Sequence, residues 1–328
     1  MHDRSMLHCV TNPKVRYFHD QHRPTLQLHS PISAGCVLDV EERCSAASTH
    51  AQAGRQIMNP TPLRLLHITD PHLLGDESLE IYDVNTTLSL RQVLQQVLAE
   101  SPVPPDAILV TGDIADDCSR EAYASLRGLL QPWGAPVLCL PGNHDSPDLM
   151  SRLLNSDGFQ YCGRADFGNW TIILLDSHVP REPSGRIAES EFERLQSELR
   201  ATTDRPVLVC VHHLPVPVGS EWLDAVGLQN GTDLLAMIDR FPQVRAVLAG
   251  HVHQPFDAIA GRVRMIATPS TCAQFTPALP TCVMDLRPPG YRWLALAIDG
   301  SIHTDVRWLQ GWKTTARPTD SRAAPFMD

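Results

Sequence analysis

From Leu63 onward, short runs of apolar residues alternate with longer amphipathic stretches. Runs of this length that contain few polar residues are typical of strands buried on both faces. The runs that we predict as strands are residues 63–69, 107–111, 136–140, 170–176, 206–211 and 244–249. Strands that alternate with helical stretches in this way predict a layered α/β domain.

Three of the intervening stretches have the features of helices. Within residues 90–98, apolar side chains recur at i, i+3, i+4, i+7 and i+8, which places them on one helix face. Ser190 followed by Glu193 predicts a capping box at the start of a second helix. Residues 232–241 are expected to form a third helix.

Beyond residue 262 the helical spacing disappears and strand-like runs follow one another directly. We predict antiparallel strands over residues 262–268, 281–286 and 291–298, with a hairpin turn at Asp299 and Gly300. These strands would form a second sheet that packs on the first.

The length of 328 residues allows one large domain. Residues 1–57 show neither a helical nor a strand-like apolar period, so we expect a disordered extension there, either a flexible tail or an upstream translation of a gene whose natural start is Met58. The extension holds six of the 15 histidines, but their irregular spacing argues against a metal-binding tract. We expect the catalytic domain to span residues 58–312 and a flexible tail to span residues 313–328.

Charge and cysteine content exclude several classes of protein. With 27 basic and 37 acidic residues, the formal charge is −10, so we expect no nucleic-acid partner. The nine cysteines form no CxxC pair, which argues against a disulfide framework or a thiolate zinc site. Because no apolar stretch is long enough for a membrane span or a signal peptide, we expect a cytoplasmic protein without a membrane partner.

Polar residues of the types that bind metals follow five of the predicted strands. The carboxyl ends of strands in open α/β sheets meet in one crevice, so residues far apart in sequence would converge there. In the two pairs separated by a single residue, both side chains can reach one ion. The residues after the five strands are Asp70 and His72, Asp113, Asn143 with His144 and Asp145, His212 and His213, and His251 and His253.

The order of these motifs is more informative than any one of them. A DxH or a GD arises by chance in a chain of this length, whereas GNHD at residues 142–145 is rare at background composition. Gly112, Gly142 and Gly250 fall where the backbone must turn sharply and pass close to a ligand. The ordered series DxH, GD, GNHD, HH and GHxH therefore predicts one composite site.

This series resembles that of the calcineurin-like metallophosphoesterases, over residues 63 to about 308. Residues 82–94, 218–230 and 267–275 are most similar to bacterial class III 3′,5′-cyclic AMP phosphodiesterases of the CpdA type. The resemblance implies a four-layer α-β-β-α sandwich of two packed mixed sheets, with a dinuclear metal site at the carboxyl ends of the strands. It also implies hydrolysis of 3′,5′-cyclic AMP to 5′-AMP by in-line attack of a metal-bridging hydroxide.

The resemblance also implies a role for each site residue. One ion is held by Asp70, His72 and His253, the second by Asn143, His212 and His251, and Asp113 bridges both. His144 is the proton donor, Asn143 assists catalysis, and the substrate contacts His72, Asp113, Asn143, His144 and His253. Two aspartates, an asparagine and four histidines without a thiolate suit two divalent transition-metal ions, Fe, Mn or Zn.

The sequence leaves several assignments open. His212 or His213 could be the ligand, and we choose His212 because it comes first after the apolar strand. Asp145 could orient a site histidine or cap a helix, and His178 could line the site or face solvent. We expect His67, inside a strand, to be structural. For Trp222, Phe275 and Asn230 we favour ordinary loop packing over contact with the purine.

Other activities remain possible on the same fold. The same ions could attack 2′,3′-cyclic nucleotides, glycerophosphodiesters or phosphomonoesters, because metals do not select the substrate. A non-catalytic binding scaffold is disfavoured by His144, and a nuclease by the acidic charge. We expect the chain to bind a cyclic nucleotide as a monomer or homodimer.

Overall fold

The computed structural model describes residues 15–17 and 61–313. The expected start at Met58 and almost all of the expected extension and tail therefore lie outside the described residues. Within the extension, β1 (Val15–Tyr17) pairs antiparallel with β10 (Phe256–Ala260). None of the described helices is both long enough and apolar enough to cross a membrane.

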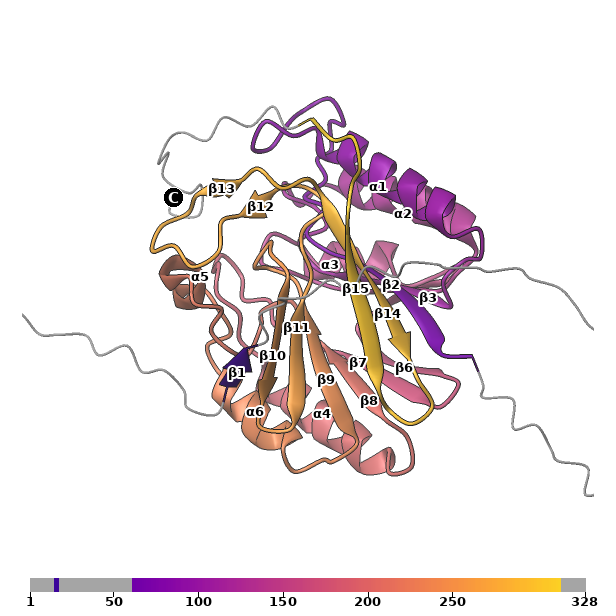
Figure 1. The fold of residues 1–328 in the computed structure, drawn as a ribbon, viewed down its shortest axis with the longest axis vertical. Coiled ribbons are helices and arrows are strands. Elements are labelled where there is room, and N and C mark those ends of the chain that lie inside the picture. Colours follow the sequence, from indigo (N-terminus) through magenta and orange to yellow (C-terminus); the bar gives the residue numbers. More distant parts are fainter. Residues whose placement is uncertain (1–14, 18–60, 314–328) are drawn as a thin grey trace, which may run out of the picture. The chain divides into compact units, whose positions relative to one another are not determined.

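One sheet has six strands in the order β15-β14-β2-β3-β4-β5 (Figure 1). Strands β2, β3, β4 and β5 run parallel, and β14 lies antiparallel to both β2 and β15. Its strands are β2 (Leu63–Ile68), β3 (Ala107–Thr111), β4 (Val137–Leu140), β5 (Phe159–Tyr161), β14 (Gly290–Leu296) and β15 (Ile302–Trp308).

The second sheet has seven strands in the order β1-β10-β11-β9-β8-β7-β6. Its four central strands, β11, β9, β8 and β7, run parallel to one another. β10 lies antiparallel to β11 on one side, and β6 lies antiparallel to β7 on the other. The further strands are β6 (Gly163–Phe167), β7 (Trp170–Leu174), β8 (Val207–Cys210), β9 (Val244–Ala249) and β11 (Val263–Ala267), and a separate pair is formed by β12 (Gln274–Phe275) and β13 (Met284–Asp285).

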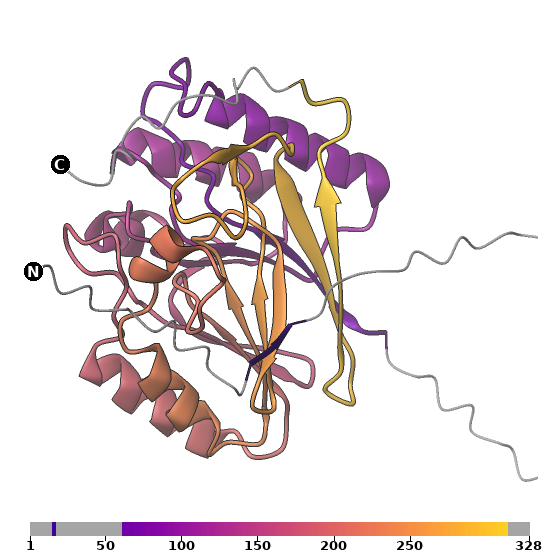
Figure 2. The same ribbon diagram turned by 60° about the vertical axis from the view of Figure 1, so that its left-hand side comes forward.

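Helices cover the outer face of each sheet, as two views show (Figure 1; Figure 2). α1 and α2 lie over the six-stranded sheet, while α4 and α6 lie over the seven-stranded one. The helices are α1 (Thr86–Glu100), α2 (Arg120–Leu130), α3 (Pro147–Leu153), α4 (Glu189–Ala201), α5 (Glu221–Ala225) and α6 (Gly231–Ile238), with a 3-10 turn at Gln131–Trp133.

Alternation along each strand divides the core into three apolar layers. In β2, Leu65 faces the other sheet and Leu66 faces the helices, because successive side chains point to opposite faces. Leu208 of β8 and Leu294 of β14 join Leu65 in the central layer between the sheets. The four-layer α-β-β-α architecture predicted from the resemblance is confirmed.

All six predicted buried strands are present, but their assignment to sheets differs from the expectation. Strands β7, β8 and β9 form the second sheet rather than continuing the first, and β11 pairs parallel with β9. β14 returns to the first sheet beside β2, and it forms the expected hairpin with β15 at Gly300. β7 and β8 are buried at every position and β9 at all but one, so the apolar pattern alone does not say which sheet these strands join.

The predicted capping box at Ser190 is wrong. α4 begins one residue earlier, at Glu189, and its N-cap Ala188 makes no side-chain hydrogen bond. Glu191 instead accepts from the backbone N–H of Asp176, which ties α4 to the end of β7. The third helix ends at Ile238, three residues before the expected boundary, because residues 239–241 turn toward β9.

Candidate metal centre

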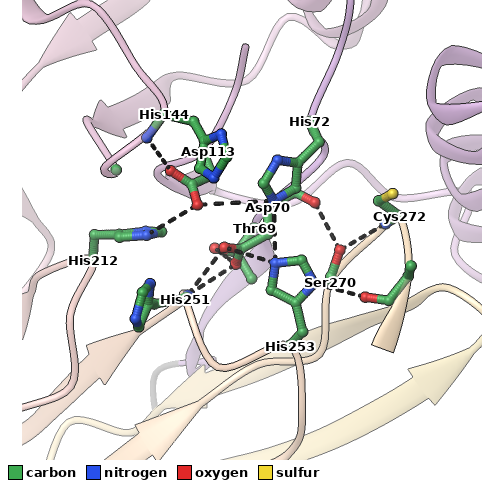
Figure 3. Close-up of polar contacts among 12 residues, drawn as sticks. Thr69, Asp70, His72, Asp113, His144, His212, His251, His253, Ser270 and Cys272 are labelled. Carbon is green, nitrogen blue, oxygen red and sulfur yellow. Dashed lines mark hydrogen bonds and ion pairs between the residues drawn. The ribbon is translucent and has the colours of Figure 1, made fainter. Parts of the chain in front are cut away.

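The residues predicted from the strand ends converge between the two sheets (Figure 3). Asp70, Asp113 and Asn143 follow β2, β3 and β4 of the six-stranded sheet. His212 and His251 follow β8 and β9 of the seven-stranded sheet. The site is therefore built from both sheets, at the carboxyl ends of their parallel strands.

The backbone at these strand ends adopts a conformation that non-glycine residues rarely use. Asp70, His72, Asp113, His251 and His253 have φ values of 51°, 46°, 48°, 68° and 47°. Left-handed conformations of this kind cost free energy and cluster at functional sites. They turn each side chain inward directly after its strand ends.

Glycine is required where the loops pass these side chains most closely. A Cβ atom at Gly142 would overlap the carboxylate of Asp113, and one at Gly250 would overlap the Thr69 hydroxyl. Both positions therefore need a residue without a side chain.

Asp70, His72 and His253 form the first group of candidate ligands, and their ligand atoms lie within 4.8 Å of one another. His72 Nδ1 lies 2.9 Å from a carboxylate oxygen of Asp116, and His253 Nδ1 lies 2.7 Å from the carbonyl oxygen of Ala273. Both Nδ1 atoms must carry the proton, because their partners can only accept. The two Nε2 atoms face each other at 3.1 Å, with Asp70 Oδ1 3.4 Å from His253 Nε2.

Asn143, His212 and His251 form the second group. His212 Nδ1 lies 2.7 Å from the carbonyl oxygen of Thr111 and so carries a proton, and its Nε2 faces Asn143 Oδ1 at 3.2 Å. Burial acts to lower the pKa of His212, but the charge of Asp113 outweighs it and raises that pKa to about 9. The same amide oxygen lies 3.1 Å from His251 Nδ1. Burial and the charge of His212 lower the pKa of His251 to about 3, so its ring is neutral at physiological pH.

Asp113 lies between the two groups. Its Oδ2 is 3.3 Å from His212 Nε2 and 3.8 Å from His72 Nε2, and its Oδ1 accepts from the backbone N–H of His144 at 2.9 Å. Burial acts to raise the pKa of Asp113, but the neighbouring histidines outweigh it and hold that pKa well below its usual range. The carboxylate is therefore ionised.

The donor set fits two cations. In each group, histidine nitrogens and carboxylate or amide oxygens approach one another closely in a buried site, and a positive ion placed there would contact all of them. Imidazole, carboxylate and amide donors without thiolate suit Fe, Mn or Zn. Three of the four candidate histidines, His72, His212 and His253, are held through their other nitrogen, as is usual at metal sites.

His144 lies beside the first group and is not directed into it. Its Nδ1 is 3.1 Å from Asp116 Oδ1, its ring centroid is 4.9 Å from that of His72, and its side chain is 19% exposed. Burial alone would lower the pKa of His144, but the charges of Asp113 and Asp116 raise it to about 9. The ring is therefore protonated at neutral pH, and its partial exposure makes it accessible to a bound substrate.

The choice between His212 and His213 is informed by their hydrogen bonds. His213 Nδ1 lies 2.8 Å from Ser177 Oγ, and its Nε2 lies 3.2 Å from the carbonyl oxygen of Pro183. Both nitrogens of His213 thus have partners other than Asp113. His213 also lies close enough to His212 and His251 for the three rings to hold one ion together. The geometry favours His212.

Asp145 has neither of the two roles considered from the sequence. Ser146 caps α3, and Asp145 accepts from the backbone N–H groups of Ile114, Ala115 and Gly142. It thereby joins the loops after β3 and β4, which carry two of the candidate ligands. Burial, with the charge of Asp113, raises the pKa of Asp145 to about 6.

The aromatic and amide candidates for purine recognition lie in packed surroundings. Asn230 bonds both backbone groups of Ile187. Phe275 is buried and stacks on His253 with ring centroids 4.4 Å apart, and Trp222 packs edge-on against Phe275. These contacts agree with the packing role that we favoured. His178 is half-buried beside Asp176.

The sequence interpretation missed Asp116, which contacts both His72 and His144. Its only signal is a place three residues after Asp113, in a run of acidic residues that resembles a solvated loop. Burial acts to raise the pKa of Asp116, but its hydrogen bonds to the two histidines outweigh burial and lower it.

Known sequences of one family are similar to this chain. Residues 63–255 match the family model of the calcineurin-like phosphoesterases. The 3′,5′-cyclic adenosine monophosphate phosphodiesterase CpdA of Pseudomonas aeruginosa is 37% identical over 243 residues, 74% of this chain and 88% of that protein. CpdA of Escherichia coli K12 is 37% identical over 248 residues, 75% of this chain and 90% of that protein.

Solved structures share the fold at low sequence identity. A dimetal phosphatase from Danio rerio has a TM-score of 0.55 at 16% identity, covering 76% of this chain and 99% of that one. GAP50 of Plasmodium has a TM-score of 0.52 at 12% identity, covering 79% and 87%.

Proposed function

The chain belongs to the calcineurin-like phosphoesterase family, and on that premise we propose that it hydrolyses 3′,5′-cyclic AMP to 5′-AMP. Support for this substrate comes from the relatives named as cyclic AMP phosphodiesterases, which are matched over about nine-tenths of their length. Support for the chemistry comes from the centre itself. The observation that carries the proposal is the convergence of histidine nitrogens with carboxylate and amide oxygens in two adjoining groups.

In this proposal each group holds one ion. Asp70, His72 and His253 bind the first, Asn143, His212 and His251 bind the second, and Asp113 contacts both. We propose Fe, Mn or Zn as the native metal, because the ligands are imidazole, carboxylate and amide. What two divalent cations supply at such a centre is an acidified water and compensation of charge on phosphoryl oxygens.

His144 provides the proton that the leaving group needs. Opening the cyclic phosphate releases the ribose 3′-oxygen as an alkoxide, which leaves poorly unless it is protonated. Asp116 accepts from Nδ1 of His144 and fixes the ring, while the raised pKa keeps the ring charged at neutral pH. The opposite nitrogen, Nε2, is then the donor to the leaving oxygen.

Asn143 and His144 also position the phosphate of the substrate. The amide of Asn143 has an N–H side as well as the oxygen that faces His212 and His251, so it can donate to a phosphoryl oxygen. His144 carries positive charge beside the first group, which favours an anionic substrate. We place the contacts of the cyclic nucleotide at His72, Asp113, Asn143, His144 and His253.

A substrate panel tests the proposal. Metal-loaded protein should hydrolyse 3′,5′-cyclic AMP with a higher kcat/KM than 2′,3′-cyclic AMP, glycerophosphodiesters or bis-p-nitrophenyl phosphate. Comparing 3′,5′-cyclic GMP in the same assay measures selectivity for the base. A clear preference for 2′,3′-cyclic AMP or a glycerophosphodiester would reject the proposed substrate and retain the reaction class.

We further propose that the protein acts in the cytoplasm as a monomer or homodimer. Within residues 61–313, Cys118, Cys139, Cys162, Cys210, Cys272 and Cys282 are all free thiols, as expected in a reducing compartment. Fractionation of cells with an antibody to the chain, and light scattering of the purified protein, test these two points.

A further inference from the structure

A buried arginine lies behind the metal centre without a carboxylate among its hydrogen-bond partners. Arg292 of β14 is 3% exposed. Its guanidinium donates to Thr268 Oγ1 at 3.0 Å, Thr304 Oγ1 at 3.1 Å and the carbonyl oxygen of Ala267 at 2.8 Å. A buried charge that is solvated only by uncharged oxygens is costly, so its retention in the core calls for a function.

From this arginine a continuous series of hydrogen bonds runs to the metal centre. Thr268 Oγ1 lies 2.6 Å from His67 Nδ1, and His67 Nε2 lies 2.7 Å from Thr111 Oγ1. Thr111 donates to Thr69 Oγ1 at 2.8 Å, and Thr69 donates to Asp70 Oδ2 at 2.7 Å. All of these residues are fully buried, and they come from β11, β2 and β3 and the loops that follow them.

The series has a single direction. Because the Asp70 carboxylate can only accept, the hydroxyl of Thr69 donates to it, and the hydroxyl of Thr111 donates to Thr69. Thr111 must then accept from His67 Nε2, and Nδ1 of the neutral His67 ring accepts from Thr268, which itself accepts from Arg292. Burial, together with the charge of Arg292, lowers the pKa of His67 to about 3, in agreement with this neutral tautomer. Every donor in the relay therefore points toward Asp70.

We propose that the Arg292–Thr268–His67–Thr111–Thr69 relay is a positioning device for Asp70. The inference rests on the proposed function, in which Asp70 is a metal ligand. Thr69 occupies Oδ2, as Figure 3 shows, and Oδ1 is left facing His253 Nε2 at 3.4 Å. The aligned dipoles also stabilise the ionised carboxylate, which has the like-charged Asp113 beside it.

Arg292 is thus a positioning residue that contacts neither substrate nor metal. Hydrogen bonds to the groups that orient a metal ligand typically change metal affinity by about 10- to 100-fold when they are removed. The relay predicts that an interruption far from the centre weakens the ion held by Asp70, His72 and His253, and leaves the other ion in place.

Thr268→Val interrupts the relay with little change of shape, four hydrogen bonds away from Asp70. Thr304→Val is the matched control, because it removes the other hydroxyl that Arg292 contacts and leaves the relay intact. Thr268→Ser restores the hydroxyl. Metal-loaded full-length proteins are equilibrated with increasing EDTA, and the metal that each chain retains is measured by elemental analysis, with Tm recorded for every variant.

We expect Thr268→Val to lose one of its two ions at about tenfold lower EDTA than the wild type, while Thr268→Ser and Thr304→Val follow the wild type. Equal metal retention in Thr268→Val and wild type, or equal losses in Thr268→Val and Thr304→Val, would overturn the relay. A wild type that binds no metal would overturn the proposed function as well. If Thr268→Val does not fold, Thr111→Val interrupts the same relay and is measured in the same way.

Discussion

The partner of each histidine nitrogen determines what that ring can do at this centre. Carbonyl oxygens behind His212 and His253 require a proton on Nδ1, so Nε2 is the nitrogen that faces the other candidate ligands. Nδ1 of His144 is held by Asp116 instead, and the raised pKa of His144 keeps its ring charged at neutral pH. In the proposed function, the first two rings bind metal and the third donates a proton.

Asp113→Ala should remove both ions. Asp113 lies within 3.8 Å of the nearest ring nitrogen of each ligand group, and without its charge the two cations would repel each other unshielded. Elemental analysis of the purified variant measures the loss, with His72→Ala as the comparison that weakens mainly one ion. Full metal content and turnover in Asp113→Ala would show that the bridge is assigned to the wrong residue.

His144→Ala should keep its metals and lose about 10² to 10⁴ in kcat with cyclic AMP. The loss should be smaller with bis-p-nitrophenyl phosphate, because p-nitrophenolate leaves without a proton. Equal losses on both substrates, with metal content intact, would instead assign His144 to stabilisation of charge on the phosphoryl oxygens.

The dependence of kcat on pH should follow the protonation of His144. Since Asp113 and Asp116 raise the pKa of His144 to about 9, the acid is present below that pH, and kcat for cyclic AMP should fall as pH rises through it. In Asp116→Asn one of the charges that raise this pKa is gone, so the alkaline limb should move to lower pH. A limb that stays in place in Asp116→Asn would disprove the assignment.

At the level of elements, the strands and their polar ends were predictable and the connections between sheets were not. Apolar runs bounded by DxH, GD, GNHD and GHxH locate the strands and the candidate ligands, because both signals are local. The pairing of β11 with β9, and of β14 with β2, depends on crossovers that no local pattern encodes. Asp116 and the relay were missed for the same reason: His67 and Thr268 are 201 residues apart in sequence.

Deletion of residues 1–57 is expected to leave cyclic AMP turnover unchanged. All candidate ligands and His144 lie between residues 70 and 253, and the one described element of the segment, the edge strand β1, pairs only with β10. A small fall in Tm is expected from the lost edge pairing. Turnover of the truncated and full-length chains under the same metal conditions checks this, and a large loss of kcat would contradict it.

On the scale of the whole molecule, the two sheets are joined in two different ways. Apolar side chains from both sheets fill the central layer, with Leu65 and Leu208 as examples. At one end of that layer, candidate ligands from the two sheets lie close together, with Asp113 Oδ2 3.3 Å from His212 Nε2. The first junction needs no ion, whereas in the proposed function the second is strengthened by bound metal.

Metal binding and folding are therefore linked by mass action. Because ligands from the two sheets meet only in the native chain, free ion at a hundred times its Kd should add about 2.7 kcal/mol to the free energy of unfolding for each independent site. Calorimetry across a series of metal concentrations should show Tm rising with each step. Scarcity of the ion would then lower not only the rate of each molecule but also the number of molecules that survive proteolysis.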